Sequence, residues 1–186
     1  MDPIRNPYVP GAGRRPSALV GRDPVIRDWT ISLQRAEAGR TDQPMILYGL
    51  RGVGKTVLLT RLRKDAAARD WLTVHVEAGS RRSLREMTGE GLYGPLSDLA
   101  RPSAGSQLLR ALKTALSFKA SYDSTGTWSF GLDLSGASGG AANSGVLLTD
   151  LTTVVHDVAM AAGESGAGLA VLIDEAQDLT ADELTT

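Results

Sequence analysis

The sequence has no cysteine and only two histidines, His75 and His156, among its 186 residues. The absence of cysteine excludes disulfide bonds, zinc sites built on thiolates and a cysteine nucleophile. Two histidines so far apart in the sequence disfavour a metal site built on imidazoles, and we expect both to be packing or surface residues. Any chemistry of this chain therefore rests on backbone groups, hydroxyls, lysines and carboxylates.

Long hydrophobic runs are also missing. No apolar stretch approaches the roughly 18 residues of a membrane span, and the N-terminal sequence lacks the charged-then-apolar order of a signal peptide. Hydrophobic residues nevertheless make up 42% of the chain and charged residues 22%, a normal composition for one domain with a buried core. We expect a cytoplasmic protein with no membrane partner.

Positive charge is absent from the C-terminal third of the chain. All 20 lysines and arginines lie at or before Lys119, so residues 1–120 carry a net charge of +9, whereas residues 121–186 hold 10 acids and no base. The basic part is compatible with phosphate-bearing partners. The alternative interpretation is that these basic residues form a solvated surface that complements the acidic part of the same fold.

Hydrophobic periodicity and turn residues predict the elements of the first half. Asp23 suits a helix N-cap and Pro24 the first helical position. The expected elements are an extended, proline-rich lead-in over 1–17, a helix over 24–38, a strand over 45–49, a helix over 54–69 and a strand over 71–77.

The second half is predicted from the same signals. Repeated glycine and proline interrupt any period over 80–105, where we expect only short helical turns. The other expected elements are a helix over 107–116, a β-hairpin over 116–134 with a turn at Asp123–Gly126, a Gly/Ser/Ala-rich connector over 135–145, a helix over 146–162 and an apolar strand over 169–174.

The strand over 45–49 runs directly into Gly49-x-x-x-x-Gly54-Lys55-Thr56 and then into a helix. This is the P-loop pattern in the context that a P-loop needs. Its glycines let successive backbone N–H groups turn toward a phosphate, Lys55 can reach the β- and γ-phosphates, and the Thr56 hydroxyl can ligate Mg²⁺. The pattern predicts a nucleoside triphosphate ligand; the alternative is an ordinary glycine-rich turn.

The last apolar strand ends in two acids, Asp174 and Glu175. Ligands of parallel sheets lie at the carboxyl ends of the strands, where these side chains emerge. We expect Asp174 to hold the Mg²⁺ shared with Thr56, directly or through a water, and Glu175 to polarise the water that attacks the γ-phosphate. A strand merely capped by polar residues is the alternative.

Three segments together resemble a known family. Leu19-Val-Gly-Arg-Asp, Gly49-Leu-Arg-Gly-Val-Gly-Lys-Thr and Val171-Leu-Ile-Asp-Glu-Ala-Gln-Asp are similar to the opening box, Walker A and Walker B of AAA+ ATPases, most closely the origin-recognition-type and related bacterial and archaeal ATPases. The resemblance covers about residues 17–180. It implies ATP and Mg²⁺ as ligands, Lys55 and Glu175 as catalytic residues, and Thr56 and Asp174 at the metal. The implied nucleotide-binding residues are Val20 and Gly21 at the adenine, with Gly49, Arg51, Gly52, Val53, Gly54, Lys55, Thr56 and Val57 at the phosphates.

The resemblance also implies a fold, a three-layer α/β/α P-loop NTPase with a parallel sheet. Proteins of this family continue after Walker B into a sensor strand, a fifth strand, an arginine finger and a helical lid, whereas this sequence ends eleven residues after Glu175. We therefore expect residues 18–186 to form an incomplete ATPase domain of a longer protein, truncated after the Walker B strand and weakly active alone. Val20-Gly21-Arg22 also fits a plain turn before a helix.

The leading functional interpretation is an ATP-dependent molecular switch. Its output is action on duplex DNA, as the resemblance implies, or on a protein partner. The alternative is a nucleotide-controlled signalling scaffold of the STAND type, whose output is assembly, including homo-oligomers. A P-loop kinase for a small molecule is a third possibility, disfavoured because an Asp-Glu pair at a strand end suits water activation.

Overall fold

The computed structural model describes residues 21–40, 43–79, 82–100, 105–123, 128–132, 134–135 and 141–185. The chain divides into two compact units, Met1–Arg69 and Asp70–Thr186, each of which is described by itself. The expected lead-in over 1–17, the hairpin turn at 124–127 and the connector over 136–140 lie outside the described residues.

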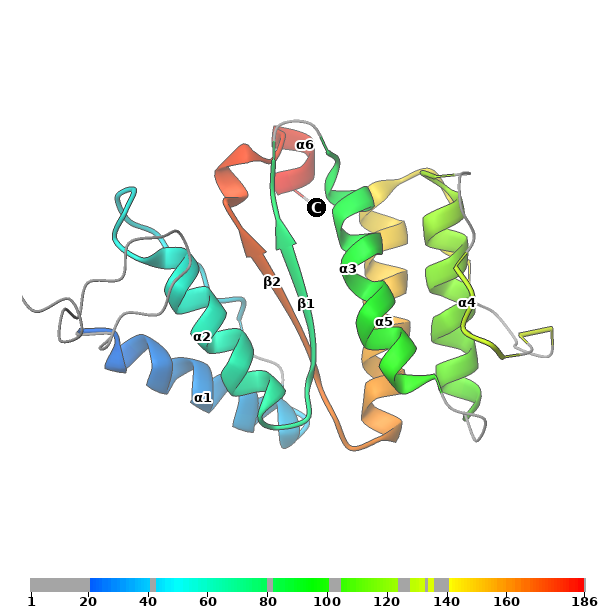
Figure 1. Ribbon diagram of the computed structural model, residues 1–186, viewed down its shortest axis with the longest axis horizontal. Coiled ribbons are helices and arrows are strands. Elements are labelled where there is room, and N and C mark those ends of the chain that lie inside the picture. The colour runs from blue at the N-terminus through cyan, green and yellow to red at the C-terminus, as the bar shows by residue number, and fades with distance from the viewer. Residues whose placement is uncertain are drawn as a thin grey trace, which may run out of the picture. The chain divides into compact units, whose positions relative to one another are not determined.

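Unit 1 is built on two neighbouring helices, α1 (Asp23–Glu37) and α2 (Lys55–Ala67) (Figure 1). Both helices were predicted, and their contact buries Leu33, Leu58, Leu62 and Ala66. The indole N–H of Trp29 donates to the carbonyl of Leu62 over 3.0 Å. The predicted N-cap is wrong: Arg22 is the N-cap, without a side-chain hydrogen bond, and Asp23 lies in the first turn, where a carboxylate favours the helix dipole.

The strand predicted over 45–49 is not observed. Residues 43–50 have no regular secondary structure, and Ile46 and Tyr48 are 79% and 91% exposed. The reason is that a strand forms only where its N–H and C=O groups bond to a neighbouring strand. The segment has the apolar run of a buried strand, but among the described residues no strand pairs with it.

Unit 2 contains two parallel strands, β1 (Leu72–Glu77) and β2 (Leu169–Asp174), which pair in register from Leu72 with Leu169 to Glu77 with Asp174. Both strands were predicted. Val74 and Val76 are buried on one face of the pair, which they share with their register partners Val171 and Ile173, 39% and 37% exposed. Ala170 and Leu172 are buried on the opposite face.

Three helices form a layer on the face that carries Val74 and Val76: α3 (Leu84–Leu99), α4 (Ser106–Ala120) and α5 (Leu147–Glu164) (Figure 1). Helix α3 packs on β1, and α4 and α5 pack on each other. The core of this layer consists of Leu92, Leu96, Leu112, Phe118, Val154 and Val158. A 3₁₀ turn, η1 (Ala176–Asp178), and a short helix, α6 (Ala181–Leu184), follow β2. No described helix is both long and apolar enough to cross a membrane.

The short turns predicted over 80–105 are wrong, because α3 is one continuous helix of 16 residues. Ser83 caps it by accepting a hydrogen bond from the Glu86 N–H. Two of its glycines allow close packing rather than breaking the helix: a Cβ at Gly89 would overlap the Tyr122 hydroxyl, and one at Gly91 would lie 3.0 Å from Val74. Tertiary packing thus outweighs low helix propensity here.

The hairpin predicted over 116–134 is wrong in its first half. Residues 116–120 form the last turns of α4, and the described residues 128–132 contain no strand. The alternation was misread, because α4 buries Leu108, Leu112, Ala115 and Phe118 at helical spacing. The aromatic residues of the supposed second strand pack instead on α3, with the rings of Trp128 and Phe130 5.1 Å and 5.5 Å from that of Tyr93.

The α/β class is thus supported by the parallel strands and their helical layer. Of the three expected layers, the described part of unit 2 shows the sheet and the helices on one face. The two predicted C-terminal elements, the helix over 146–162 and the strand over 169–174, are confirmed as α5 and β2.

Candidate functional site

The loop between Gly49 and Lys55 contains two glycines in a left-handed backbone conformation. Gly52 and Gly54 adopt φ angles of +83° and +84°, in the left-handed region that residues with a Cβ avoid. No atom lies within 4 Å of where a Cβ would stand at either glycine. Glycine is therefore required at these two positions by the backbone conformation and not by a lack of space. Such a conformation is expected for a loop whose N–H groups turn toward an anion.

Helix α2 begins directly at this loop and has no side-chain cap. Its first backbone hydrogen bond runs from the Leu58 N–H to the Gly54 carbonyl, so the N–H groups of residues 55–57 precede the helical hydrogen-bond ladder. Uncapped N–H groups and the positive end of the helix dipole favour a bound anion. Lys55 and Thr56 thus stand in the first turn of the helix, where the P-loop pattern predicts them.

The Lys55 ammonium folds back over the loop. Its Nζ lies 3.1 Å from both the Gly49 and the Leu50 carbonyl oxygens. A flexible cation held only by neutral carbonyls exchanges readily to a phosphate oxygen, a far stronger acceptor. The lysine is therefore already positioned beside the glycine loop.

Arg22 also reaches this loop, a contact that sequence reasoning missed. Its guanidinium Nη2 donates to the Val53 carbonyl over 2.8 Å. Arg22 follows Gly21, which is exposed and has a φ of +76°. Val20 lies outside the described residues, so the predicted adenine pocket stays a prediction. The signal that could have found this contact is the basic residue next to Val20-Gly21 in the opening box.

Asp174 and Glu175 stand at the carboxyl end of β2, as predicted. The Asp174 side chain is 7% exposed, and its Oδ1 accepts a hydrogen bond of 2.9 Å from the Glu175 N–H. The Asp174 carbonyl accepts from the Ala78 N–H, which extends the pairing of the two strands by one residue. The strand pairing therefore fixes the backbone at Asp174.

Glu175 adopts a φ of +51°, one of two non-glycine residues with a positive φ among those described. Such a conformation costs free energy and often occurs at functional residues. The Gln177 amide, in η1, donates to Glu175 Oε2 and holds the carboxylate at the strand end. Sequence reasoning assigned no role to Gln177, although it follows the acid pair by two residues.

The predicted site residues are distributed over both units. Unit 1 brings together the residues from Gly49 to Val57, in which Arg51, Gly52 and Val53 are exposed and Val57 is half-buried, whereas unit 2 holds Asp174 and Glu175. The shared Mg²⁺ between Thr56 and Asp174 therefore stays a prediction. In the described parts of the chain, no group of three His, Asp or Glu side chains forms a ready metal cluster.

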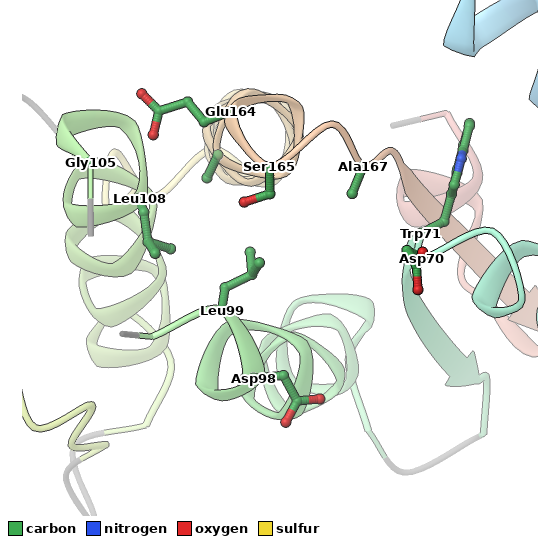
Figure 2. A pocket seen from close by; sticks show the side chains of 10 residues that line it. Asp70, Trp71, Asp98, Leu99, Gly105, Leu108, Glu164, Ser165 and Ala167 are labelled. Carbon is green, nitrogen blue, oxygen red and sulfur yellow. The ribbon is translucent and has the colours of Figure 1, made fainter. Parts of the chain in front are cut away.

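A separate cavity of about 880 Å³ lies at the opposite end of the two strands from Asp174 (Figure 2). Helices α3, α4 and α5 and the residues that precede β1 and β2 surround it. Its distance along the sheet from the acid pair, and its acidic lining through Asp70, Asp98 and Glu164, exclude it as the place of a triphosphate.

Comparison with known proteins identifies the family of this chain. No curated protein and no solved structure matches this chain. A family model described as the AAA ATPase domain matches residues 18–186, a range that includes the glycine loop, α2 and the acid pair of β2. The match spans most of the chain, and its range begins just before Gly21 and Arg22. The protein therefore belongs to the AAA ATPase domain family, whose fold is that of the P-loop NTPases.

Proposed function

We propose that this chain binds ATP with Mg²⁺ and hydrolyses it as a molecular switch. Family membership supports nucleotide binding and ATPase activity in general. The observation that carries the proposal is the uncapped start of α2 beside the left-handed glycines, with the Lys55 ammonium held over the same loop. This arrangement offers backbone donors and a positive charge to a phosphate chain.

In the proposed mechanism, the backbone N–H groups of the loop and of residues 55–57 bind the phosphate oxygens. Lys55 exchanges its carbonyl partners for the β- and γ-phosphates and stabilises the charge that develops during transfer. Arg22 keeps the Val53 carbonyl turned away from the phosphates, which leaves the adjoining N–H groups available to them.

The oxygen donors present fit Mg²⁺, which prefers hard ligands. We propose that the Thr56 hydroxyl and the Asp174 carboxylate hold the ion; Asp174 Oδ1 is engaged by the Glu175 N–H, which leaves Oδ2 as the donor. When bound, Mg²⁺ neutralises phosphate charge.

Glu175 is the proposed general base. The Gln177 amide engages Oε2, so Oε1 is the oxygen that accepts a proton from the attacking water. The Asp174 carboxylate accepts from the Glu175 N–H and so holds the Glu175 backbone, while the Gln177 amide holds the Glu175 carboxylate. In this proposal Asp174 binds the metal and Glu175 transfers the proton.

The output of the switch is proposed to be a conformational change read by duplex DNA or a protein partner, including a second copy of the chain. The origin-recognition-type resemblance and the basic N-terminal part support DNA, whereas a STAND-like scaffold would respond by assembly. Salt-dependent binding of duplex DNA distinguishes the first from ATP-dependent oligomerisation without DNA.

The test measures binding and turnover separately in the purified chain. We expect Lys55→Ala to weaken binding of a fluorescent ATP analogue by at least about tenfold, since it removes a charge-assisted contact. We expect Glu175→Gln to bind the analogue as the wild type does and to lose turnover. The matched control is Lys64→Ala, which removes an exposed lysine from the last turn of the same helix. Equal binding by Lys55→Ala and the wild type would contradict the proposal.

A further inference from the structure

The cavity at the amino ends of β1 and β2 has a chemistry unlike that of the nucleotide site. Its walls carry both polar and apolar groups, and the apolar side chains among them are those of Trp71, Leu99, Leu108, Ala161 and Ala167. Leu99 and Leu108 point into the space from α3 and α4, and Ser165 points into it from the end of α5 (Figure 2). These residues define what we call the basal groove. Its volume of about 880 Å³ accepts several side chains.

Three acids surround the basal groove, each from a different element. Asp70 precedes β1, Asp98 lies in the last turn of α3 and Glu164 ends α5, and all three are exposed. No lysine, arginine or histidine is among the described residues that line it. The rim of the basal groove therefore carries three negative charges over a floor that includes apolar side chains, and these charges repel phosphate-bearing ligands.

Four described basic side chains of unit 2 have partners away from the rim. Arg85 pairs with Asp150 over 2.9 Å, Arg110 with Asp157 over 3.0 Å and Lys119 with Asp123 over 2.9 Å. Arg82 is likewise engaged by Glu86 and Glu90 on α3. These four side chains therefore do not neutralise the acids of the rim. A positive group that meets the rim must come from elsewhere.

The groove is also held in shape by close packing. A Cβ at Gly168 would overlap the ring of Trp71, so the indole lies directly on the backbone before β2. A Cβ at Gly105 would lie 2.5 Å from Glu164 Oε2, which places that carboxylate against the N-cap of α4. The favourable field at a helix start helps to hold the Glu164 carboxylate in place.

We propose that the basal groove docks a basic peptide segment of a partner protein, with apolar side chains in the groove and arginines or lysines on its rim. Charge complementarity argues for this occupant, because three separated carboxylates match an extended segment with alternating cations. A single metal ion does not fit, since no three acids of the described residues converge. The site lies at the opposite strand ends from Asp174, and the proposal is independent of ATP hydrolysis.

The experiment titrates the full chain into a fluorescein-labelled peptide of alternating arginine and leucine and measures fluorescence anisotropy. The double variant Asp98→Asn, Glu164→Gln removes two rim charges and is expected to weaken binding by about fivefold or more. The control Glu77→Gln, Asp178→Asn removes the same charge from exposed positions near the other strand ends. We expect it to change the dissociation constant less than twofold. Equal weakening by both variants would show diffuse attraction and would overturn the proposal.

A second variant tests the groove without changing charge. Ser165→Trp places a large side chain at an exposed position that faces the cavity. We expect this variant to lose peptide binding. Its melting temperature should stay within a few degrees of that of the wild type. Unchanged affinity in this variant would overturn the proposal. Equal affinity for a peptide of alternating arginine and glycine would do the same, because it would show that the apolar floor contributes nothing.

The last variant tests whether a segment of the same chain occupies the basal groove. Arg101 belongs to the segment 101–104, which lies outside the described residues and joins Ala100 to Gly105. If Arg101→Ala tightens peptide binding by about tenfold or more, the chain's own arginine is the occupant and the proposal is wrong. An unchanged dissociation constant supports a partner's segment.

Discussion

The guanidinium of Arg22 donates a 2.8 Å hydrogen bond to the carbonyl of Val53, which joins the residue before α1 to the loop before α2. The two residues lie 31 positions apart in the sequence, and Val53 itself is 41% exposed. The loop conformation is thus supported from outside by one long side chain.

Replacement of Arg22 is expected to weaken nucleotide binding. Arg22→Met keeps the length of the side chain and removes the donor, so the Val53 carbonyl can rotate and compete with the adjoining N–H groups. We expect the dissociation constant of a fluorescent ATP analogue to rise about fivefold, the value of one hydrogen bond near 1 kcal/mol. Arg27→Met, an exposed arginine on α1, is the control. A similar rise in both variants would refute the role of Arg22.

Gln177 is expected to affect turnover and not binding. Gln177→Ala removes the amide that holds Glu175 Oε2, so the carboxylate samples more rotamers. We expect kcat for ATP hydrolysis to fall about tenfold, with the affinity for ATP unchanged. Steady-state kinetics and analogue binding on the same preparation separate the two effects. A fall in affinity without a fall in kcat would show that Gln177 acts on the nucleotide and not on Glu175.

Two glycines of α3 are expected to respond in opposite ways to alanine. Gly89→Ala forces a Cβ into the Tyr122 ring and should destabilise the fold by about 1–3 kcal/mol. Gly94→Ala has nothing within 4 Å of its Cβ position and should stabilise the helix by up to about 1 kcal/mol. Urea unfolding measures both. Equal effects would mean that α3 and Tyr122 do not pack as described.

Asp157 makes stability depend on acid pH. Burial raises the pKa of this carboxyl, but hydrogen bonds from Thr114 and Arg110 outweigh burial and hold the pKa below its ordinary value. Because the folded pKa is depressed, the stabilisation is complete above the unfolded pKa of about 4 and is lost as pH falls through the folded value.

Substitution of Asp157 tests this dependence. We expect Asp157→Asn to lower the unfolding free energy by about 1–3 kcal/mol at neutral pH and by less below pH ~4, where the wild-type carboxyl becomes protonated. Urea midpoints from pH 3 to 7 measure it. His156 Nδ1 lies 3.4 Å from Asp157, so both proteins should carry His156→Asn to remove its titration. A difference that stays constant with pH would contradict the prediction.

Local sequence signals predicted the parts of the fold that depend on a few adjacent residues. Helices α1, α2 and α5 and strands β1 and β2 follow from their own periodicity, and the glycine loop follows from positions that need a left-handed backbone. The two acids after an apolar strand identified the end of β2. Sequence reasoning missed Arg22 and Gln177, because each acts through a side-chain hydrogen bond that the motif spacing does not specify.

The errors have one cause, which is that burial is decided by distant residues. Gly89 tolerates a helix because Tyr122 packs on it, and residues 116–120 become helical because Phe118 joins a core built from α3 and α5. The strand expected over 45–49 had the correct pattern, but pairing requires a second strand that no local signal supplies.

The sequence by itself determined the family, the glycine loop before α2 and the acid pair, because backbone conformation and motif spacing are encoded within a few residues. Only the tertiary structure decided the continuous helix α3, the extended α4, the buried hydrogen bond from Thr114 to Asp157 across 43 residues, and the basal groove. These features arise where separate elements meet, and their free energy depends on contacts that no single segment contains.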